Sequence, residues 1–382
     1  MLTRRRLLQS SALIAVPLVL SPRLARADQK RLDVYYAGDS NIVDWWNNVV
    51  TPKFEAANPD YKINFVTTRT GGGMVQIGER ALAALKVKAD PQTDYLEEYD
   101  PRLPPGATEA GLWTTFSEKN VPSYRKLNPL AIQTPLTIPY RGSQVLFAYN
   151  SDKVKESEVP KTWPGLVAWI KAHPGQFIYN RPNKGGSGRN FVVRAIHEAN
   201  GRNPSLFTVS NFTKQLADER LPKAWEILRD LAPHLYNGGA YTAGNTPTLQ
   251  ILASGAVSMI TAWSDQALQG LAQGVLPPSI KLVQLQDLAL CGGYVQSAIP
   301  VNAAHLEGAL KLADFLLSTE IQTSILKDLG GFPSVSWDHL PADLKTRFAD
   351  VIPTSIPIYP TGEWEAAMND GWYRNVAPNI AP

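Results

Sequence analysis

Strands and helices alternate in the hydrophobic pattern of the first hundred residues. Residues 32–36 and 61–68 show the β-branched and aromatic pattern of strands, and residues 41–50 carry apolar side chains at helical spacing. A run of three glycines, residues 71–73, opens a second helix over residues 75–85. This order of strand, helix, strand and helix predicts a parallel sheet covered by helices.

The alternation continues along the chain, with no repeat and no flexible linker. Further strands are predicted at residues 145–150, 177–179, 257–262, 280–285 and 294–299, and helices at residues 190–199, 212–230, 246–254 and 306–317. At about 150 residues per domain, 382 residues favour two domains. We therefore expect an α/β fold of two lobes joined by ordered strands, which is how a hinge is built.

Ligands in such folds bind at the carboxyl ends of the strands, where the strand order reverses. Tyr36 and Asp39 follow the first predicted strand, and Thr70 and Gly72 follow the second. A carboxylate beside an aromatic ring suits an ammonium group, and a glycine backbone admits close approach of a ligand. The alternatives are that Asp39 caps a helix and that the glycines form a tight turn.

The first 27 residues predict a signal peptide. Three arginines, residues 4–6, precede an apolar run at residues 12–20, and Ala25-Arg26-Ala27 is a cleavage site. Arginines followed by two leucines are typical of a twin-arginine signal, with the general secretory route as the alternative. No cysteine follows the apolar run, so we expect no lipid anchor and a mature chain soluble in the periplasm.

Charge and cysteine content narrow the classes of function. The formal net charge of +3 falls to −2 without residues 1–27, because this segment holds five arginines and no acidic residue. The basic balance therefore belongs to the leader, which disfavours a nucleic-acid-binding protein. A single cysteine, Cys291, excludes an internal disulfide, a redox-active cysteine pair and a cysteine-based zinc cluster.

The sequence does not favour an enzyme or a resident cofactor. Its five histidines are scattered, and Gly-Gly-Ser-Gly-Arg around Ser187 lacks the last glycine of a nucleophile elbow. There is no phosphate-binding loop or dinucleotide fingerprint. A ferric-iron receptor is less favoured, because Tyr35 and Tyr36 alternate to opposite faces of a strand. We expect no catalytic residues, no cofactor and no metal.

The order of several segments resembles the bacterial extracellular solute-binding proteins of ABC transporters, in the branch that binds spermidine, putrescine and thiamine. The resemblance lies in residues 146–154, 160–164, 255–265, 298–317 and 330–333. It implies a periplasmic-binding-protein fold of type II, in which two lobes close on a small solute and deliver it to a permease with its ATPase. It also implies a monomer that performs no chemistry.

Two crossovers between the lobes are implied by the same resemblance. They divide the chain into lobe one, residues 28–148 plus 264–318, and lobe two, residues 149–263 plus 319–382.

The resemblance also places Trp263 and Asp265 where polyamine receptors grip a cationic amine. The chemistry is consistent, because an indole face attracts a cation and a carboxylate pairs with it. The alternative is a core tryptophan followed by a surface aspartate. On this basis the predicted solute is a small polar cation of polyamine or thiamine type.

Three further groups of residues leave other possibilities open. Ser187, Gly188 and Arg189 precede a predicted helix, and this arrangement would suit an anionic or zwitterionic solute. Tyr294 could stack on a ligand ring or pack in the core. The acidic group formed by Glu97, Glu98 and Asp100 is expected on a solvated surface.

Overall fold

The computed structural model describes residues 29–37, 39–68, 71–97, 99–348, 357, 359–360 and 362–381. The predicted signal peptide and Thr70 lie outside the described residues. Among the helices of the described residues, none has both the length and the hydropathy of a membrane span.

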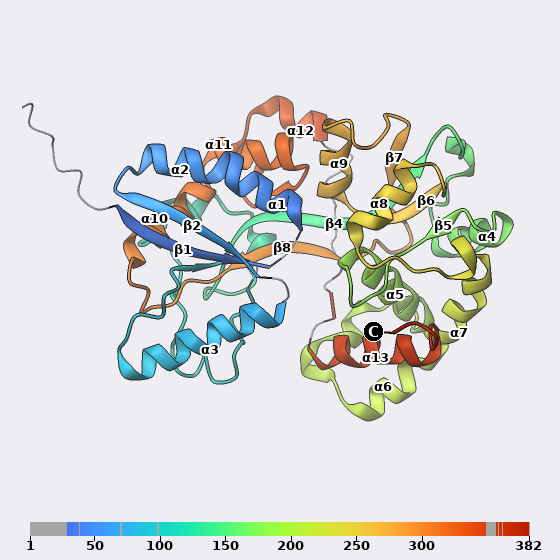
Figure 1. The fold of residues 1–382 in the computed structure, drawn as a ribbon, viewed down its shortest axis with the longest axis horizontal. Coiled ribbons are helices and arrows are strands. Elements are labelled where there is room, and N and C mark those ends of the chain that lie inside the picture. The colour runs from blue at the N-terminus through green and yellow to red at the C-terminus, as the bar shows by residue number, and fades with distance from the viewer. Residues whose placement is uncertain are drawn as a thin grey trace, which may run out of the picture.

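The described residues form two β-sheets flanked by helices (Figure 1). The strands are β1 (Lys30–Tyr36), β2 (Tyr61–Thr67), β3 (Tyr95–Leu96), β4 (Ile138–Asn150), β5 (Phe177–Ile178), β6 (Met259–Trp263), β7 (Ile280–Val283), β8 (Gly292–Ser297) and β9 (Phe332–Pro333). The α-helices are α1 (Ser40–Trp45), α2 (Thr51–Ala57), α3 (Gly71–Val87), α4 (Trp163–Ala172), α5 (Gly186–Ala199), α6 (Lys214–Arg220), α7 (Pro222–Leu231), α8 (Asn245–Ala253), α9 (Ser264–Ala272), α10 (Leu306–Leu316), α11 (Thr319–Ser324), α12 (Ala342–Phe348) and α13 (Glu363–Asn375). The π-helical segments Trp46–Val50 and Ile325–Leu329 continue α1 and α11.

The N-terminal sheet has the strand order β2-β1-β3, and both strand pairs are parallel, as the pattern predicted. Successive side chains of β1 point to opposite faces of this sheet. Leu32 and Val34 pack in one cluster with Trp46 from the α1–α2 side, while Tyr35 packs in another with Ile77 of α3. The helices α2 and α3 therefore lie on opposite sides of the sheet (Figure 1).

One long strand connects the two halves of the molecule. All 13 residues of β4 are buried. Its first half, up to Gln144, pairs with β8 and β9, and its second half, from Val145, pairs with β6 and β7. In Figure 1, β4 and β8 run between the two groups of helices. The expected connection by ordered strands is thus present.

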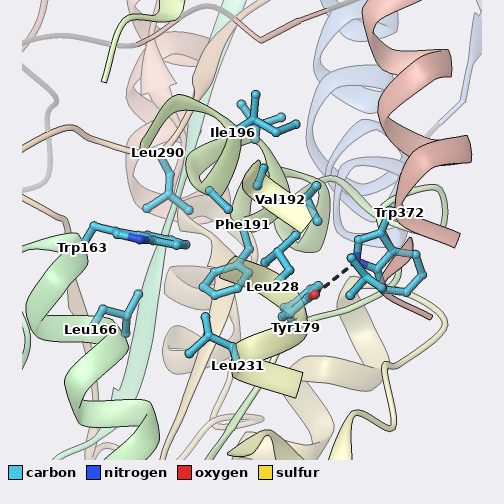
Figure 2. Packing of buried hydrophobic residues seen from close by; sticks show 14 of the residues in the cluster. Trp163, Leu166, Tyr179, Phe191, Val192, Ile196, Leu228, Leu231, Leu290 and Trp372 are labelled. Atoms are coloured by element: carbon cyan, nitrogen blue, oxygen red, sulfur yellow. Dashed lines mark hydrogen bonds between the residues drawn. The ribbon is translucent and has the colours of Figure 1, made fainter. Parts of the chain in front are cut away.

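The largest core lies under α4, α5, α7 and α13. Trp163 packs on Phe191 with ring centroids 5.2 Å apart, and Trp372 of α13 donates a hydrogen bond of 3.2 Å to the hydroxyl of Tyr179 (Figure 2). Truncating a buried aromatic side chain costs about 3–5 kcal/mol. The helix α13 is therefore an integral part of this lobe.

The packing clusters divide the chain differently from the expected boundaries. Residues 321–344 pack with the N-terminal sheet, and the Trp45 indole N–H donates to the Ser324 hydroxyl at 2.8 Å. Residues from Ala267 to Cys291 pack instead with the second half of β4. The physical reason is that α11 covers α1, whereas α9 covers the sheet formed by β4 and β6. We propose lobe one as residues 29–144 plus 292–348, and lobe two as residues 145–291 plus 362–381.

Acid is expected to destabilise lobe two through His197. Burial, together with the nearby Arg194 cation, lowers the pKa of His197 to about 4 from the 6.5 of a free histidine. Between these values the unfolded chain binds a proton that the folded chain does not bind. The free energy of unfolding should therefore decrease as the pH is lowered from about 6.5 to about 4, by up to about 3 kcal/mol. Urea denaturation at pH 7, 6, 5 and 4 measures this free energy of unfolding.

The variant His197→Gln should flatten this pH dependence, because its side chain does not titrate. His339, whose side chain is exposed, supplies the matched control His339→Gln, which should retain the wild-type dependence. An identical dependence in wild type and His197→Gln would contradict the assignment.

Candidate functional site

Polar side chains from both lobes meet where α1, α8 and α9 begin. The residues that share hydrogen bonds there, together with Trp263, whose indole lies against Gly186 beside Ser187, are called the interlobe site. They are Asp39, Asn41, Ser143, Asn180, Ser187, Asn245, Trp263 and Asp265. The parallel strand β1 ends just before Asp39, so the site lies at the edge of the sheet where ligands of α/β folds bind.

Two hydrogen bonds join the start of α1 and the residue before it to the other lobe. The Asn245 amide donates from Nδ2 to Oδ2 of Asp39 at 3.2 Å, and the Asn41 amide donates from Nδ2 to Oδ2 of Asp265 at 3.4 Å. Each bond pairs an amide with a carboxylate, so each carboxylate is held by a donor from the facing helix. These contacts define a closed arrangement of the lobes.

The Asp39 and Asp265 carboxylates repel each other inside this closed site. Asp265 is 5% exposed and accepts a hydrogen bond of 2.7 Å from the Ser143 hydroxyl on β4. Burial raises the pKa of Asp39, and the negative charge of Asp265 raises it further. The Asn245 hydrogen bond and the Arg141 cation oppose this rise. Two acidic groups therefore share one small, poorly solvated space.

A buried ion pair lies next to the carboxylates. Arg141 on β4 contacts Glu97 at 3.1 Å, and the Tyr140 hydroxyl donates a hydrogen bond to Glu97 while accepting one from Arg141. Burial of the fully enclosed Glu97 raises its pKa, which the Arg141 cation opposes. Arg141 acts on both Glu97 and Asp39, so one cation is shared among the three carboxyl groups of Asp39, Asp265 and Glu97.

Trp263 brings an aromatic ring to the same place. Its indole lies against Gly186 at the start of α5, where an added Cβ would come within 2.6 Å of the ring. A glycine at this position therefore admits the indole. The ring is half-buried, and the next two residues along the chain are Ser264 and Asp265 of the site.

Ser187 and Gly188 are held by two asparagines. The Ser187 hydroxyl donates to Oδ1 of Asn180 at 2.6 Å, and the Gly188 N–H donates to the same oxygen at 2.7 Å. The Ser187 N–H donates to Oδ1 of Asn245 at 3.2 Å. Amide oxygens of the protein itself therefore occupy the donors that were expected to bind an anion.

Arg189 is directed to α13. Its guanidinium contacts Glu365 at 2.5 Å and lies 5.1 Å from the centroid of the Tyr359 ring. Its Nε also donates to the carbonyl of Pro182 at 3.0 Å. This side chain therefore fastens α13 to α5.

Three other predicted residues lie apart from this group. Tyr36 is buried in the core of lobe one, with its ring stacked on Phe65 at a centroid distance of 5.9 Å. Tyr294 lies over Gly142 and its hydroxyl accepts a hydrogen bond of 3.5 Å from Asn128. Gly72 lies in the first turn of α3. The structure thus brings together Asp39, Ser187, Trp263 and Asp265 from the predicted set.

Sequence reasoning missed several polar residues of this region. Glu97 was expected on a solvated surface but is fully buried, so that expectation is wrong. Its position directly after strand β3, which pairs with the central strand β1, is a signal that could have identified it. Arg141 and Ser143 are hidden in a strand that reads as uniformly buried. Asn245 pairs with Asp39, 206 positions away, so no local pattern marks this contact.

The residues that the structure describes contain no group of three or more His, Cys, Asp or Glu arranged to hold a metal ion. The interlobe site instead presents carboxylates, amides, hydroxyls and one indole. Such a set of side chains can hold an organic solute by hydrogen bonds and charge.

Comparisons with known proteins agree with this fold. The model of the bacterial extracellular solute-binding protein family matches residues 50–337. No curated protein matches the sequence at a significant level. Among solved structures, a periplasmic thiamin binding protein is 18% identical, with 91% of this chain and 96% of that chain covered and a TM-score of 0.63.

Two further structures are similar over nearly their whole length. The spermidine/putrescine ABC transporter substrate-binding protein PotD from Streptococcus pneumoniae is 15% identical, with coverage of 91% of this chain and 98% of that chain and a TM-score of 0.64. The Atu4243–GABA receptor is 15% identical, with coverage of 93% and 99% and a TM-score of 0.65. At these identities the likeness shows the fold alone.

The fold and the enclosed polar site are those of a two-lobed binding receptor of type II. The chain belongs to the bacterial extracellular solute-binding protein family, whose members are the substrate-binding components of ABC transporters and work with a small-molecule solute and a permease. The protein is therefore a transport receptor and not an enzyme, as the sequence predicted.

Removing the Asp265 charge should lower the pKa of Asp39. In the variant Asp265→Asn the repulsion is lost while the hydrogen bond from Asn245 remains, so Asp39 should titrate closer to an ordinary aspartate. Carboxyl carbon NMR of Asp39 across pH 3 to 8 measures the change. The control Asp370→Asn changes an exposed carboxylate that pairs with Arg374, and should leave Asp39 unchanged. Equal Asp39 titrations in wild type and Asp265→Asn would show that the carboxylates do not interact.

Proposed function

We propose that this receptor captures a small organic cation, with an ammonium-type nitrogen, between Asp39 and Asp265. The observation that carries the proposal is the excess of negative charge in the interlobe site. Its nearby base, Arg141, already pairs with Glu97. A bound cation would offset the repulsion between the two carboxylates and would form a charge-assisted hydrogen bond with each of them.

The Trp263 indole supports a cationic solute of modest size. An indole face attracts a cation within about 6 Å of the ring, and the attraction grows when water is excluded. The indole is half-buried against Gly186 and is followed directly by Ser264 and Asp265. A nitrogen between the carboxylates with its carbon chain on the indole would use both kinds of contact.

Contacts from both lobes give the mechanism of capture. Asp39 and Asn41 belong to lobe one, while Asn245 and Asp265 lie on helices of lobe two. A solute that touches both sides binds the closed form more tightly than the open form, and so shifts the population toward closure. The closed receptor then docks on its permease.

The hydrogen bonds at α5 favour a cation over an anion. The N–H groups of Ser187 and Gly188 already donate to protein amides, and Arg189 already contacts Glu365. An anionic or zwitterionic solute at this helix start would have to displace these partners. Polyamine- and thiamine-like cations are therefore the first solutes to test.

The proposal includes where the receptor works. Residues 1–27 have the pattern of a twin-arginine signal peptide, whose removal would release the mature chain from Asp28 into the periplasm. There it would act as a monomer, since one cleft and one hinge suffice for capture. It would not be lipid-anchored, since no cysteine follows the apolar run of the signal peptide.

A thermal-shift screen should identify the solute among amines. The library contains polyamines, thiamine and its phosphates, amino acids, phosphonates, sugars and ferric iron. A solute at one hundred times its dissociation constant adds ~2.7 kcal/mol to the free energy of unfolding, so its melting shift should be clear. A shift produced only by anions, sugars or iron would contradict the proposal.

Calorimetric titration of variants tests the site itself. Asp39→Asn and Asp265→Asn should each weaken binding of the amine by about 10- to 100-fold, as expected for loss of a charge-assisted contact. Arg189→Gln serves as the matched control and should leave amine affinity unchanged, because Arg189 contacts Glu365 instead. Unchanged affinity in both aspartate variants would refute the assignment.

A further inference from the structure

The ladder of hydrogen bonds between β4 and β6 is continued by a side chain where β6 ends. Its last pair on this side joins Val145 to Trp263, and α9 begins at the next residue, Ser264. The antiparallel register, continued by one position, places Ser264 opposite Gln144 of β4. The Gln144 N–H donates to the Ser264 hydroxyl at 3.3 Å. The first residue of α9 therefore extends the ladder by one step.

The next position of the same register brings a serine to a carboxylate of the interlobe site. Ser143 on β4 faces Asp265 on α9, and its hydroxyl donates to Oδ1 of Asp265 at 2.7 Å. The hydroxyl oxygens of Ser143 and Ser264 lie 3.2 Å apart, within hydrogen-bond distance. Neither serine, nor Gln144 or Asp265, is more than 5% exposed. Water therefore does not compete for these hydrogen bonds.

The two ends of this chain of hydrogen bonds determine its direction. A backbone N–H can only donate, and a carboxylate can only accept. The Ser143 hydroxyl uses its one proton on Asp265, so it accepts from Ser264, whose oxygen in turn accepts from Gln144. The chain of Gln144, Ser264, Ser143 and Asp265 is called the hinge relay. Its hydrogen bonds all point the same way, and bonds in such a chain polarise and strengthen one another.

The hinge relay crosses between the lobes at the point where β4 changes partners. Gln144 is the last residue of β4 that pairs with β8, and Val145 is the first that pairs with β6. In the division proposed above, Ser143 and Gln144 belong to lobe one, whereas Ser264 and Asp265 belong to lobe two. A hinge motion is absorbed by a few residues at the end of an element or between two units. A bend of β4 at this point would separate Ser143 from Asp265, so the relay is complete in the closed arrangement.

We propose that Ser264 and Ser143 are positioning residues, which link the hinge of β4 to the Asp265 carboxylate and hold it in place for the solute when the lobes close. Neither hydroxyl has to contact the solute, because its effect passes through Asp265. This role rests on the proposed function, in which Asp265 binds the solute. It adds the means by which the bend of the hinge controls one of the two carboxylates.

Hydrogen exchange of the Gln144 amide, followed by NMR in the solute-free protein, tests the relay itself. Ser264→Ala removes the acceptor of the Gln144 N–H and should speed its exchange about tenfold. Asp265→Ala removes the acceptor at the far end of the relay. The two serine hydroxyls are then free to turn, so the same exchange should become at least about threefold faster.

The variant Asn41→Ala separates the relay from a general loosening of the closed arrangement. It removes the other side-chain donor to Asp265, which comes from the facing lobe, and leaves both serine hydroxyls in place. Exchange of the Gln144 amide should therefore match the wild type. Faster exchange in Ser264→Ala but not in Asp265→Ala would overturn the inference, because the hydrogen bond would then be local. Equal acceleration in Asn41→Ala and Asp265→Ala would also overturn it.

Titration calorimetry with putrescine dihydrochloride tests the effect on binding. Ser143→Ala should weaken binding about tenfold and Ser264→Ala about threefold to tenfold. The double variant should bind as weakly as Ser143→Ala alone, because one missing link already interrupts the relay. Ser258→Ala is the matched control and should leave the affinity unchanged. It removes a buried serine hydroxyl that donates to Gln176, just before the opposite end of β6.

The outcomes separate the relay from the proposed function. Putrescine affinity that is unchanged in both serine variants, or that falls additively in the double variant, would overturn the positioning role. If the wild type does not bind putrescine, the proposed function fails for this amine, and the exchange of the Gln144 amide decides the relay alone. Melting curves identify any variant that does not fold. If Asp265→Ala is one of these, Ser143→Ala takes its place in the exchange measurement and should also speed exchange at Gln144.

Discussion

The arrangement of this receptor depends on one strand that both lobes share. The first half of β4 is hydrogen-bonded into lobe one and the second half into lobe two. Because the strand is continuous and buried, the site residues that it carries, Arg141 and Ser143, sit at the junction of the lobes. The helices that contribute Asp39 and Asp265 approach this junction from either side. Closure of the two lobes therefore encloses the carboxylates of Asp39 and Asp265.

Enclosed charge is the basis of the proposal that the site takes a cation. Carboxylates that lose water resist ionisation unless a donor or a positive charge compensates them. Here the compensation is incomplete, since asparagine amides and the Ser143 hydroxyl supply donors but Arg141 is shared with Glu97. A receptor built in this way leaves part of the compensation to its solute. Under this proposal the closed form is most stable when a cation is present.

Sequence analysis predicted the parts of the molecule that depend on local pattern. The parallel pairing of β1 and β2, the hinge-like connection and the family follow from periodicity and from the order of segments. The strand pattern placed Asp39, Trp263 and Asp265 near a sheet edge, because they lie at or shortly after the ends of β1 and β6. The partners of these residues could not, because Asn245 and Ser143 reach them through contacts between segments far apart in the chain.

The proposed lobe boundaries differ from the expected ones for the same reason. Whether α9 and α11 pack on one sheet or the other is decided by matching of their buried faces, not by their position along the chain. Glu97 shows most clearly what local sequence cannot reveal. An acidic residue in an acidic stretch is expected on a solvated surface until its buried partner Arg141 is known.

Proton release on binding tests most directly the claim that the site lacks positive charge. Titration calorimetry of the amine solute near pH 5, in buffers with different ionisation enthalpies, counts protons exchanged per solute bound. A cation between Asp39 and Asp265 favours their ionised forms, so the account predicts net release of protons, which is lost in Asp39→Asn. Net uptake of protons, or release that persists in that variant, would contradict it.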